Sequence, residues 1–276
     1  MSSLSLGVYI VTFVLGICVL SLTLDAWILS RFNISSTPMK ASIPKQILQT
    51  SKSGLPPHIK PLVLKQVQGW NYRHFTDAEC DAYISSSQVA ALHFPSLLYV
   101  FRRLKGAHRA DVFRYLWLYE HGGVFLDSDL MLYSPLDDIV EDQSFVSCLD
   151  AQDRSVFTGF LGCAPGHPIL FAALQAVVAT PTVLLTQFKA PWLRPLNVYT
   201  YTIYIRQMKR IVDAYQSHDG ATVKLLREVL HDEAGTYSVL REQGCANKTV
   251  VAIHYHKFKD VPYFQPDISN LEDPCK

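Results

Sequence analysis

The sequence predicts an α/β domain in which a mixed, mostly parallel sheet is flanked by helices. Short apolar runs that fit buried strands alternate along the chain with longer segments whose apolar residues recur at helical spacing. Turn residues, chiefly glycine and proline, separate the two kinds of segment. The length of 276 residues and the hydrophobic content of 49% suffice for one sizeable core, so we expect a single folded domain.

The N-terminal part of the chain differs in kind from the rest. Residues 7–24 carry no charge, and the apolar run continues past Asp25 to residue 29. At about 1.5 Å per residue, a helix of this length can cross a bilayer. A cleaved signal peptide is the alternative, but no clear Ala-x-Ala exit follows. We therefore expect a tail at 1–6, a signal anchor at 7–29, a polar stem at 30–42 and the folded domain at 43–276.

The domain is expected to start with the turn and helix signals of its first half. Residues 53–57, Ser-Gly-Leu-Pro-Pro, predict a turn, and a helix is expected over 59–68. A second helix is expected over 77–84, with Thr76 as its N-cap.

The most informative segment is 108–129, which predicts a helix, a glycine stop, a buried strand and then two carboxylates. Apolar residues recur at helical spacing over 110–119, and Gly122-Gly123 can adopt the left-handed conformation that ends a helix. The apolar run 124–126 then fits an interior strand.

Asp127 and Asp129 follow this strand at its C-terminal edge, where open α/β sheets bind ligands. Two carboxylates one residue apart can hold one hard cation, Mn²⁺ or Mg²⁺, and leave positions free for phosphate oxygens. Asp111 and Arg114 share one helix face and are expected to project toward the same cleft. An isolated Asp-x-Asp is often accidental and an isolated Asp-x-x-Arg pair is usually solvated, but the combination in this order favours a metal-diphosphate site.

Three further segments complete the predicted domain. An apolar helix is expected over 168–179, ending before Pro181, in preference to a second membrane span at 169–185. The aromatic and basic stretch 191–215 fits an amphipathic helix, with an acceptor-side or membrane-facing surface as the alternative. A last apolar strand, 250–256, places His254 and His256 on one face, where they serve either a structural role or metal binding.

The central segment resembles the DXD-containing sugar transferases of glycosyltransferase family 32. Two other stretches extend the resemblance. Residues 43–50, Ile-Pro-Lys-Gln-Ile-Leu-Gln-Thr, are similar to the family's opening strand, with Leu48 in place of the usual His. Thr158-Gly-Phe and Gly166-His-Pro resemble a later strand and helix, with Thr158 where Asn is common. The Ser-Trp that usually follows the last strand is missing.

The resemblance implies a GT-A-like fold and a retaining, metal-dependent hexosyltransferase. Asp129 would hold Mn²⁺ or Mg²⁺, and Asp127 would bridge metal, sugar or ribose. Asp111 and Arg114 would hold the donor sugar and steady the leaving phosphate. Further residues that the resemblance assigns to the site are the nucleotide-binding candidates Gln49 and Thr50 and the third metal ligand His254. No catalytic base or nucleophile stands out.

The resemblance also implies substrates and a location. The expected donor is GDP-mannose rather than a UDP-hexose, and the expected acceptor is a glycan or a sphingolipid such as inositol phosphoceramide. The resemblance places the domain in the lumen of the Golgi, or of the ER, on a single-pass anchor. The glycosylation triplets at Asn33 and Asn247 agree with the lumen, whereas Arg31, Lys40 and Lys45 after the anchor would favour the cytosol.

Several alternatives stay open. A galactosyl- or glucosyltransferase that uses a UDP-sugar would share the motif, and the departures at Leu48 and Thr158 would also suit a non-catalytic binding protein with the same fold. A phosphohydrolase would require a nucleophile and more clustered carboxylates. The net charge of +1 indicates no affinity for nucleic acid. Outside the anchor, five cysteines without Cys-x-x-Cys spacing disfavour a zinc site and leave one or two disulfides open.

Overall fold

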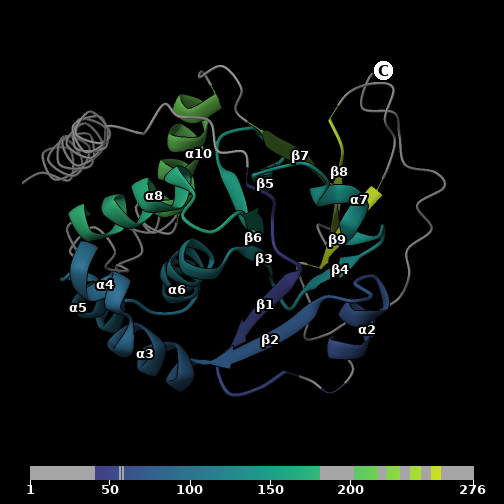
Figure 1. Cartoon of the computed structure of the whole chain (residues 1–276). Helices are drawn as coiled ribbons and strands as arrows, with labels where there is room; N and C mark the ends of the chain where they lie inside the picture. The colour runs from purple at the N-terminus through teal and green to yellow at the C-terminus, as the bar shows by residue number, and fades with distance from the viewer. Residues whose placement is uncertain are drawn as a thin grey trace, which may run out of the picture.

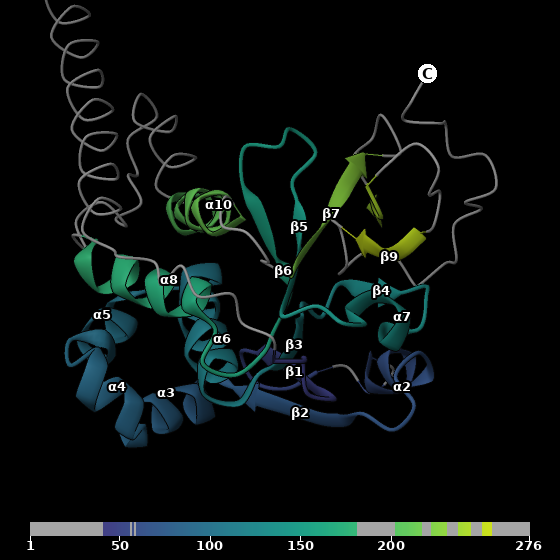
Figure 2. The same cartoon turned by 45° about the horizontal axis from the view of Figure 1, so that its top comes forward.

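The fold is a mixed α/β arrangement built on one long, curled sheet (Figures 1 and 2). The computed structural model describes residues 41–55, 57, 59–180, 202–216, 222–230, 237–243 and 250–255. Within these ranges nine strands form the sheet, in the order β2-β1-β3-β6-β5-β7-β8-β9-β4. The strands are β1 (Gln46–Ser51), β2 (Asn71–Thr76), β3 (Gly123–Leu126), β4 (Leu130–Leu132), β5 (Phe145–Leu149), β6 (Val156–Cys163), β7 (Val223–Leu230), β8 (Tyr237–Arg241) and β9 (Val250–Tyr255).

The expectation of a mostly parallel sheet was wrong. Only β1 with β2, β1 with β3 and β5 with β7 pair in parallel, whereas the other five pairings are antiparallel. The physical reason lies in the connections. Strands β5 and β6, β7 and β8, and β8 and β9 are each joined by only six to eight residues, too few for the crossover that a parallel neighbour requires.

Helices cover both faces of the sheet, in unequal numbers. One face carries α3 (Asp77–Ser86), α4 (Gln88–His93), α5 (Leu97–Arg103), α6 (Ala107–His121), α8 (Pro168–Ala179) and α10 (Ile203–Gln216). The other face carries the shorter α2 (Ile59–Lys65) and α7 (Leu136–Val140). Successive strand residues alternate between the two cores: Leu48 and Phe125 face the larger, Ile47 and Val124 the smaller. The central strands are therefore buried on both sides.

The locally encoded elements confirm the sequence predictions. Helix α6 ends at His121, and its C-cap Gly122 has φ +66°, the left-handed region that glycine adopts without strain. Gly123 (φ +105°) also allows β1 to approach β3, because a Cβ there would lie 2.6 Å from the carbonyl oxygen of Gln46. Thr76 caps α3 in a reciprocal capping box with Glu79.

Two further helix predictions are confirmed, and a third helix is shorter than predicted. Helix α8 is confirmed as a core helix, since its residues from Ile169 to Leu174 are largely buried. Helix α2 ends at Lys65 rather than 68, because the chain turns there and buries Val67. Helix α10 confirms the helix expected within 191–215, and residues 191–201 lie outside the described residues.

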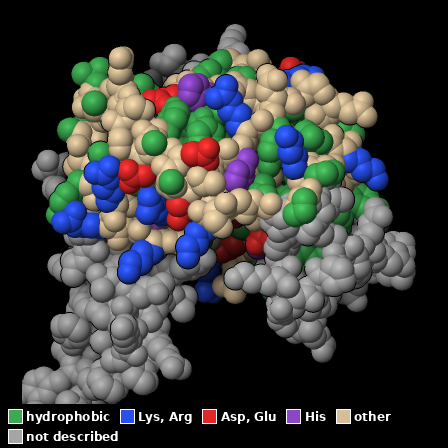
Figure 3. Space-filling view, turned by 90° about the horizontal axis from the view of Figure 1, so that it is seen from below, with side chains coloured by type: hydrophobic (Ala, Val, Ile, Leu, Met, Phe, Trp, Pro, Cys, Tyr) green, Lys and Arg blue, Asp and Glu red, His purple; other side chains and the backbone are tan. Residues whose placement is uncertain are grey.

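Several expectations fall on residues outside the described ranges. These are the anchor 7–29, most of the stem, both glycosylation triplets and His256. In the part of the chain that is described, no helix has the length and hydropathy to cross a membrane. The described cysteines Cys80, Cys148 and Cys163 are buried free thiols. On the face seen in Figure 3, acidic and histidine side chains lie among the lysines and arginines rather than apart from them.

Candidate active site

The two aspartates lie in the turn between β3 and β4, where the chain crosses from the middle of the sheet to its far edge. The amide of Asp127 donates to the carbonyl of Gly159 on β6 at 2.8 Å. The carbonyl of Asp129 accepts from the amide of Tyr255 on β9 at 3.0 Å. Bonds to two different strands therefore fix the turn at both ends.

Gly159 is required beside the first aspartate. A Cβ built on it would lie 2.5 Å from Oδ2 of Asp127 and 2.3 Å from the ring of Phe157. Real Cβ atoms do not approach other atoms so closely, so a larger residue at this position would displace the carboxylate. The resemblance of the Thr158-Gly-Phe segment to the family therefore has a steric explanation here.

Arg114 connects helix α6 to the first aspartate. Its side chain is 3% exposed and donates from Nη1 to the carbonyl of Thr158 at 2.6 Å and from Nη2 to Oδ1 of Asp127 at 3.3 Å. The guanidinium also lies 3.9 Å from the centre of the Phe125 ring. The same Nη2 is 3.7 Å from Oδ1 of Asp111. The structure thus brings Asp111, Arg114 and Asp127 together.

Asp111 is buried and held from several directions. The hydroxyl of Thr158 donates to its Oδ1 at 3.0 Å, and Nδ1 of His108 lies 3.9 Å from its Oδ2. Burial raises the pKa of the Asp111 carboxyl, while the charge of Arg114 opposes that shift. We call Asp111, Arg114 and Thr158 the helix half of the site.

Asp129 lies beside the last strand. Its Oδ2 is 3.8 Å from Nε2 of His254, which is opposite Leu130 in the β4–β9 ladder. Its Oδ1 is buried and has no hydrogen-bond partner within the described residues. Burial, and next the charge of Asp127, raises the pKa of the Asp129 carboxyl to about 6.

His254 has partners on three sides. Its Nδ1 is 3.0 Å from Oε1 of Glu228 on β7, its Nε2 faces Asp129, and its ring stacks on Phe157 with centroids 4.5 Å apart. Burial lowers the pKa of His254, but the hydrogen bond to Glu228 and the charge of Asp129 outweigh it and raise the pKa. We call Asp129, Glu228 and His254 the strand half of the site.

The two residues expected to contact the nucleotide differ in exposure. Gln49 is fully buried: its amide nitrogen donates to the carbonyl of Asp127 at 3.4 Å, and its amide oxygen accepts from the hydroxyl of Tyr72 at 2.8 Å. Gln49 therefore stabilises the turn that carries the two aspartates. Thr50 is half-buried on β1, opposite Phe75. Nucleotide contact by either residue stays a prediction.

Comparison with known proteins bears on the family resemblance. Residues 63–146 match the family model described as the glycosyltransferase sugar-binding region containing a DXD motif. The matched part of the chain contains α6, β3 and the turn that carries both aspartates. The resemblance of 108–129 to DXD-motif sugar transferases is confirmed by this match.

Two further likenesses concern individual proteins. Over 136 residues the chain is 32% identical to the initiation-specific alpha-1,6-mannosyltransferase of Candida albicans, and the match covers 45% of this chain and 34% of the relative. The chain thus spans about a third of that relative's length. The solved structure of the PaToxG glycosyltransferase is similar at 13% identity with a TM-score of 0.40, covering 71% of this chain and 82% of that chain. The GT-A part of the fold prediction stays a prediction.

The donor atoms at the aspartate turn fit the chemistry of a hard divalent cation. Asp127 and Asp129 offer carboxylate oxygens, His254 offers an imidazole nitrogen, and the unpartnered Oδ1 of Asp129 is the kind of buried oxygen that a cation would satisfy. Among the described residues no three His, Cys, Asp or Glu side chains are gathered closely enough to hold a metal ion. A cation here would therefore need further ligands, which substrate phosphates can supply.

Sequence reasoning missed Glu228 and Phe157. Glu228 is a buried carboxylate within the otherwise mostly apolar strand β7, and that pattern was a usable signal. The contact of Glu228 with His254 could not be predicted from the sequence, because 26 residues separate the two. Phe157 directly precedes the predicted segment Thr158-Gly-Phe, and its contact with His254 joins β6 to β9.

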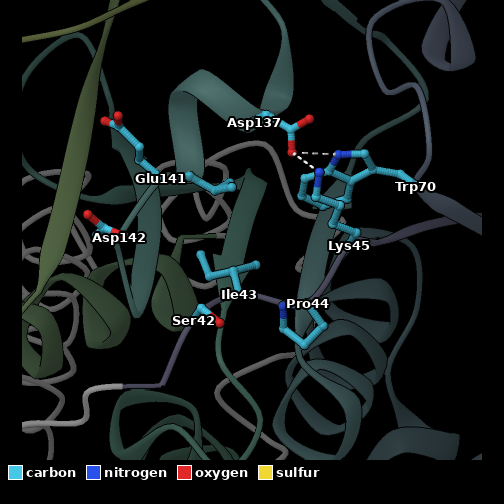
Figure 4. Close-up of a pocket in the computed structure, with 9 residues that line it drawn as sticks. Ser42, Ile43, Pro44, Lys45, Trp70, Asp137, Glu141 and Asp142 are labelled. Carbon is cyan, nitrogen blue, oxygen red and sulfur yellow. Dashed lines mark hydrogen bonds and ion pairs between the residues drawn. The ribbon is translucent and has the colours of Figure 1, made fainter.

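A hollow with a volume of about 480 Å³ lies where the chain enters β1 (Figure 4). It is lined by the chain leading into β1 and by α7 with the residues that follow it. Asp137 accepts there from Nε1 of Trp70 at 3.2 Å and lies 3.0 Å from Nζ of Lys45. Strand β1 begins at this hollow and ends on the side of the aspartate turn, so the two places are separate.

Proposed function

We propose that the chain is a metal-dependent, retaining mannosyltransferase that uses GDP-mannose and transfers the sugar to a glycan or to a sphingolipid such as inositol phosphoceramide. The proposal of mannose rests on the likeness to a protein named as an alpha-1,6-mannosyltransferase. Metal dependence and retention rest on the DXD region and on the family resemblance.

One observation carries the proposal: two carboxylates at one sheet edge, each with a different basic neighbour. Asp127 lies 3.3 Å from the buried guanidinium of Arg114, and Asp129 lies 3.8 Å from the imidazole of His254. One carboxylate is thereby held rigidly by the protein, and the other keeps an oxygen available for a ligand. This division suits a site that must hold a cation and a diphosphate together.

The chemistry follows from the charge that develops when the donor bond breaks. Negative charge grows on the diphosphate oxygen as the sugar departs, and a bound Mn²⁺ or Mg²⁺ acts there as a Lewis acid. Asp129 and His254 would hold that ion with Asp127. Arg114 fixes the orientation of Asp127 from inside the protein. Asp111 supports the position of Arg114.

Glu120 and Asp150 are two carboxylates that could be considered as the catalytic base, but both are engaged in other hydrogen bonds. Glu120 accepts hydrogen bonds from the hydroxyls of Tyr83 and Ser87. The carboxylate of Asp150 accepts from the amides of Gln152 and Arg154 and so holds the β5–β6 turn. We assign the base to neither.

The departures from the family pattern at Leu48 and Thr158 leave the hydrogen bonds of the site intact. Leu48 is fully buried in the larger core, where an apolar side chain packs without cost. Thr158 provides the hydroxyl that bonds Asp111 and a carbonyl that accepts from Arg114. These contacts favour an enzyme over a non-catalytic binding protein with the same fold.

Donor hydrolysis tests the proposal directly. The full chain would be incubated with Mn²⁺ and GDP-mannose, UDP-galactose or UDP-glucose, and release of the nucleotide measured. We expect turnover of GDP-mannose that Asp129→Ala abolishes and that Asp137→Ala, at the hollow where the chain enters β1, leaves within a factor of two. Turnover of a UDP-sugar alone would replace the mannose assignment. If the full chain neither binds nor turns over any of these donors, the enzyme proposal is wrong.

We also propose that the enzyme is anchored by residues 7–29 in the Golgi or ER membrane, with its domain in the lumen. The apolar run and the Asn247 triplet support this location. Expression in a glycosylating host, followed by glycosidase treatment, gives the readout. A mobility shift that disappears in Asn247→Gln supports the lumen, and an unmodified Asn247 argues against it.

A further inference from the structure

The carboxylate of Glu228, which was not among the predicted site residues, contacts Nδ1 of His254. Glu228 is on β7, two strands away from His254 on β9, and the two side chains meet across β8. It is 8% exposed, which is rare for a glutamate that has no structural or functional reason to be inside. The mechanism proposed above gives it no role.

The partners of Glu228 place it in one orientation. Its Oε1 accepts from the hydroxyl of the fully buried Ser238, and the same oxygen is 3.0 Å from Nδ1 of His254. Ser238 is opposite His254 in the β8–β9 ladder, so the hydroxyl lies between the strands that carry the carboxylate and the imidazole. The carboxylate oxygen is therefore shared between this ring nitrogen and this hydroxyl.

This contact favours one tautomer of His254. An ionised carboxylate only accepts hydrogen bonds, so an ionised Glu228 requires Nδ1 to be the donor. In the neutral imidazole the lone pair is then on Nε2, the nitrogen that faces Asp129 at 3.8 Å. The ring cannot easily turn away, because it stacks on Phe157 at an interplanar angle of 28°.

We propose that Glu228 is a positioning residue that holds His254 in the tautomer and orientation required to bind the cation of the transferase. The inference rests on the proposed function, because it supposes a cation at Asp129. A histidine that binds a metal usually donates its other N–H to a carboxylate or carbonyl, and loss of that partner weakens metal binding about 10- to 100-fold. Glu228 provides such a partner.

The test measures metal binding rather than turnover. The full chain, kept in detergent because of the predicted anchor, would be titrated with Mn²⁺ in the presence of GDP, and free Mn²⁺ would be followed by electron paramagnetic resonance. We expect Glu228→Gln to raise the Mn²⁺ Kd about 10- to 100-fold with little change in circular dichroism. Ser238→Ala should raise it about two- to fivefold.

The matched control is Glu242→Gln. Glu242 directly follows β8 and pairs with Lys224, away from His254. Its variant should bind Mn²⁺ within a factor of two of the wild type. An equal loss in both variants would show a general electrostatic effect and overturn the proposal.

A second measurement needs no variant. Nitrogen-15 NMR of metal-free wild type should show the proton of neutral His254 on Nδ1, and a proton on Nε2 would overturn the proposal even if Glu228→Gln failed to fold. A wild type that binds no Mn²⁺ with GDP contradicts the proposed function itself. Normal Mn²⁺ binding by Glu228→Gln contradicts only the role given to Glu228.

Discussion

In the helix half of the site the charged groups are satisfied inside the protein, whereas in the strand half Asp129 keeps a buried oxygen without a described partner. Arg114 is bonded to Thr158 and Asp127 and is close to Asp111. This difference supports the proposal that one half stabilises the turn and the other binds a ligand. Substitutions in the helix half should therefore affect stability first, and those in the strand half should affect metal binding and turnover first.

The largest expected effect is that of Arg114→Met. Removal of the guanidinium leaves the buried Asp111 without its nearest cation, and breaking a buried pair costs about 3–5 kcal/mol. Denaturant unfolding followed by circular dichroism measures this loss. The control Arg102→Met removes a more exposed pair with Asp81 and should cost at most about 1 kcal/mol. A loss below 1 kcal/mol for Arg114→Met would contradict the supporting role.

Asp129→Asn should separate turnover from stability. Loss of a metal-binding carboxylate is expected to lower donor turnover by about 100-fold or more, which corresponds to roughly 2.7 kcal/mol. The metal-free variant should nevertheless be more stable at pH 7 by about 1 kcal/mol, after allowance for solvent screening of a carboxyl that is 34% exposed.

The pH dependence of that gain follows from the pKa of Asp129, which is raised to about 6 in the folded protein. Above this pKa the folded protein holds an unfavourable charge, which the amide removes. Below the ordinary pKa of an aspartate, about 4, the carboxyl is protonated in both the folded and unfolded states and the gain disappears. Thermal unfolding of both proteins without metal at pH 7 and pH 4 checks this. A variant that is less stable at pH 7 would show that Asp129 is structural.

Thr158→Val tests the helix half with a smaller change. The valine keeps the shape of the side chain but removes the hydroxyl that donates to Asp111, which should cost about 2 kcal/mol. Thr158→Ser retains the hydroxyl and should lose less than about 1 kcal/mol. If Thr158→Ser loses as much stability as Thr158→Val in denaturant unfolding, the methyl group matters as much as the hydroxyl, and the prediction is contradicted.

The smallest expected effect is that of Phe157→Leu in the strand half. The stacked ring restrains His254, and an aromatic contact of this kind contributes about 0.5–1.5 kcal/mol. We expect the Mn²⁺ Kd to rise about two- to tenfold in the titration with GDP. Phe171→Leu on α8, which removes an aromatic contact with Phe94, should leave the Kd unchanged.

The sequence was a good guide wherever the structure depends on neighbouring residues. The helix end at Gly122 and the start of β3 follow from glycine conformation and apolar spacing, and both are confirmed. The position of Asp127 and Asp129 after that strand is confirmed for the same reason. Their roles in catalysis remain to be measured.

The sequence was a poor guide wherever distant segments meet. The direction of most strand pairs depends on which strands become neighbours, and the expectation of a mostly parallel sheet failed for that reason. Gln49 was a candidate for nucleotide contact, which stays a prediction, but its burial and its bond to the carbonyl of Asp127 could not be predicted from the sequence. No local pattern distinguishes a glutamine that contacts a nucleotide from one that supports a turn.

By itself, the sequence determined the α6–β3 element and the two aspartates that follow it, and it led to the chemistry proposed for them. Only the tertiary structure decided which groups surround each aspartate. Arg114 and Gly159 lie beside Asp127, and His254, which contacts Glu228, lies beside Asp129. The physical reason is range. Backbone conformation and capping act over a few residues, whereas burial and hydrogen bonding in this site join segments separated by 13 to more than 100 residues.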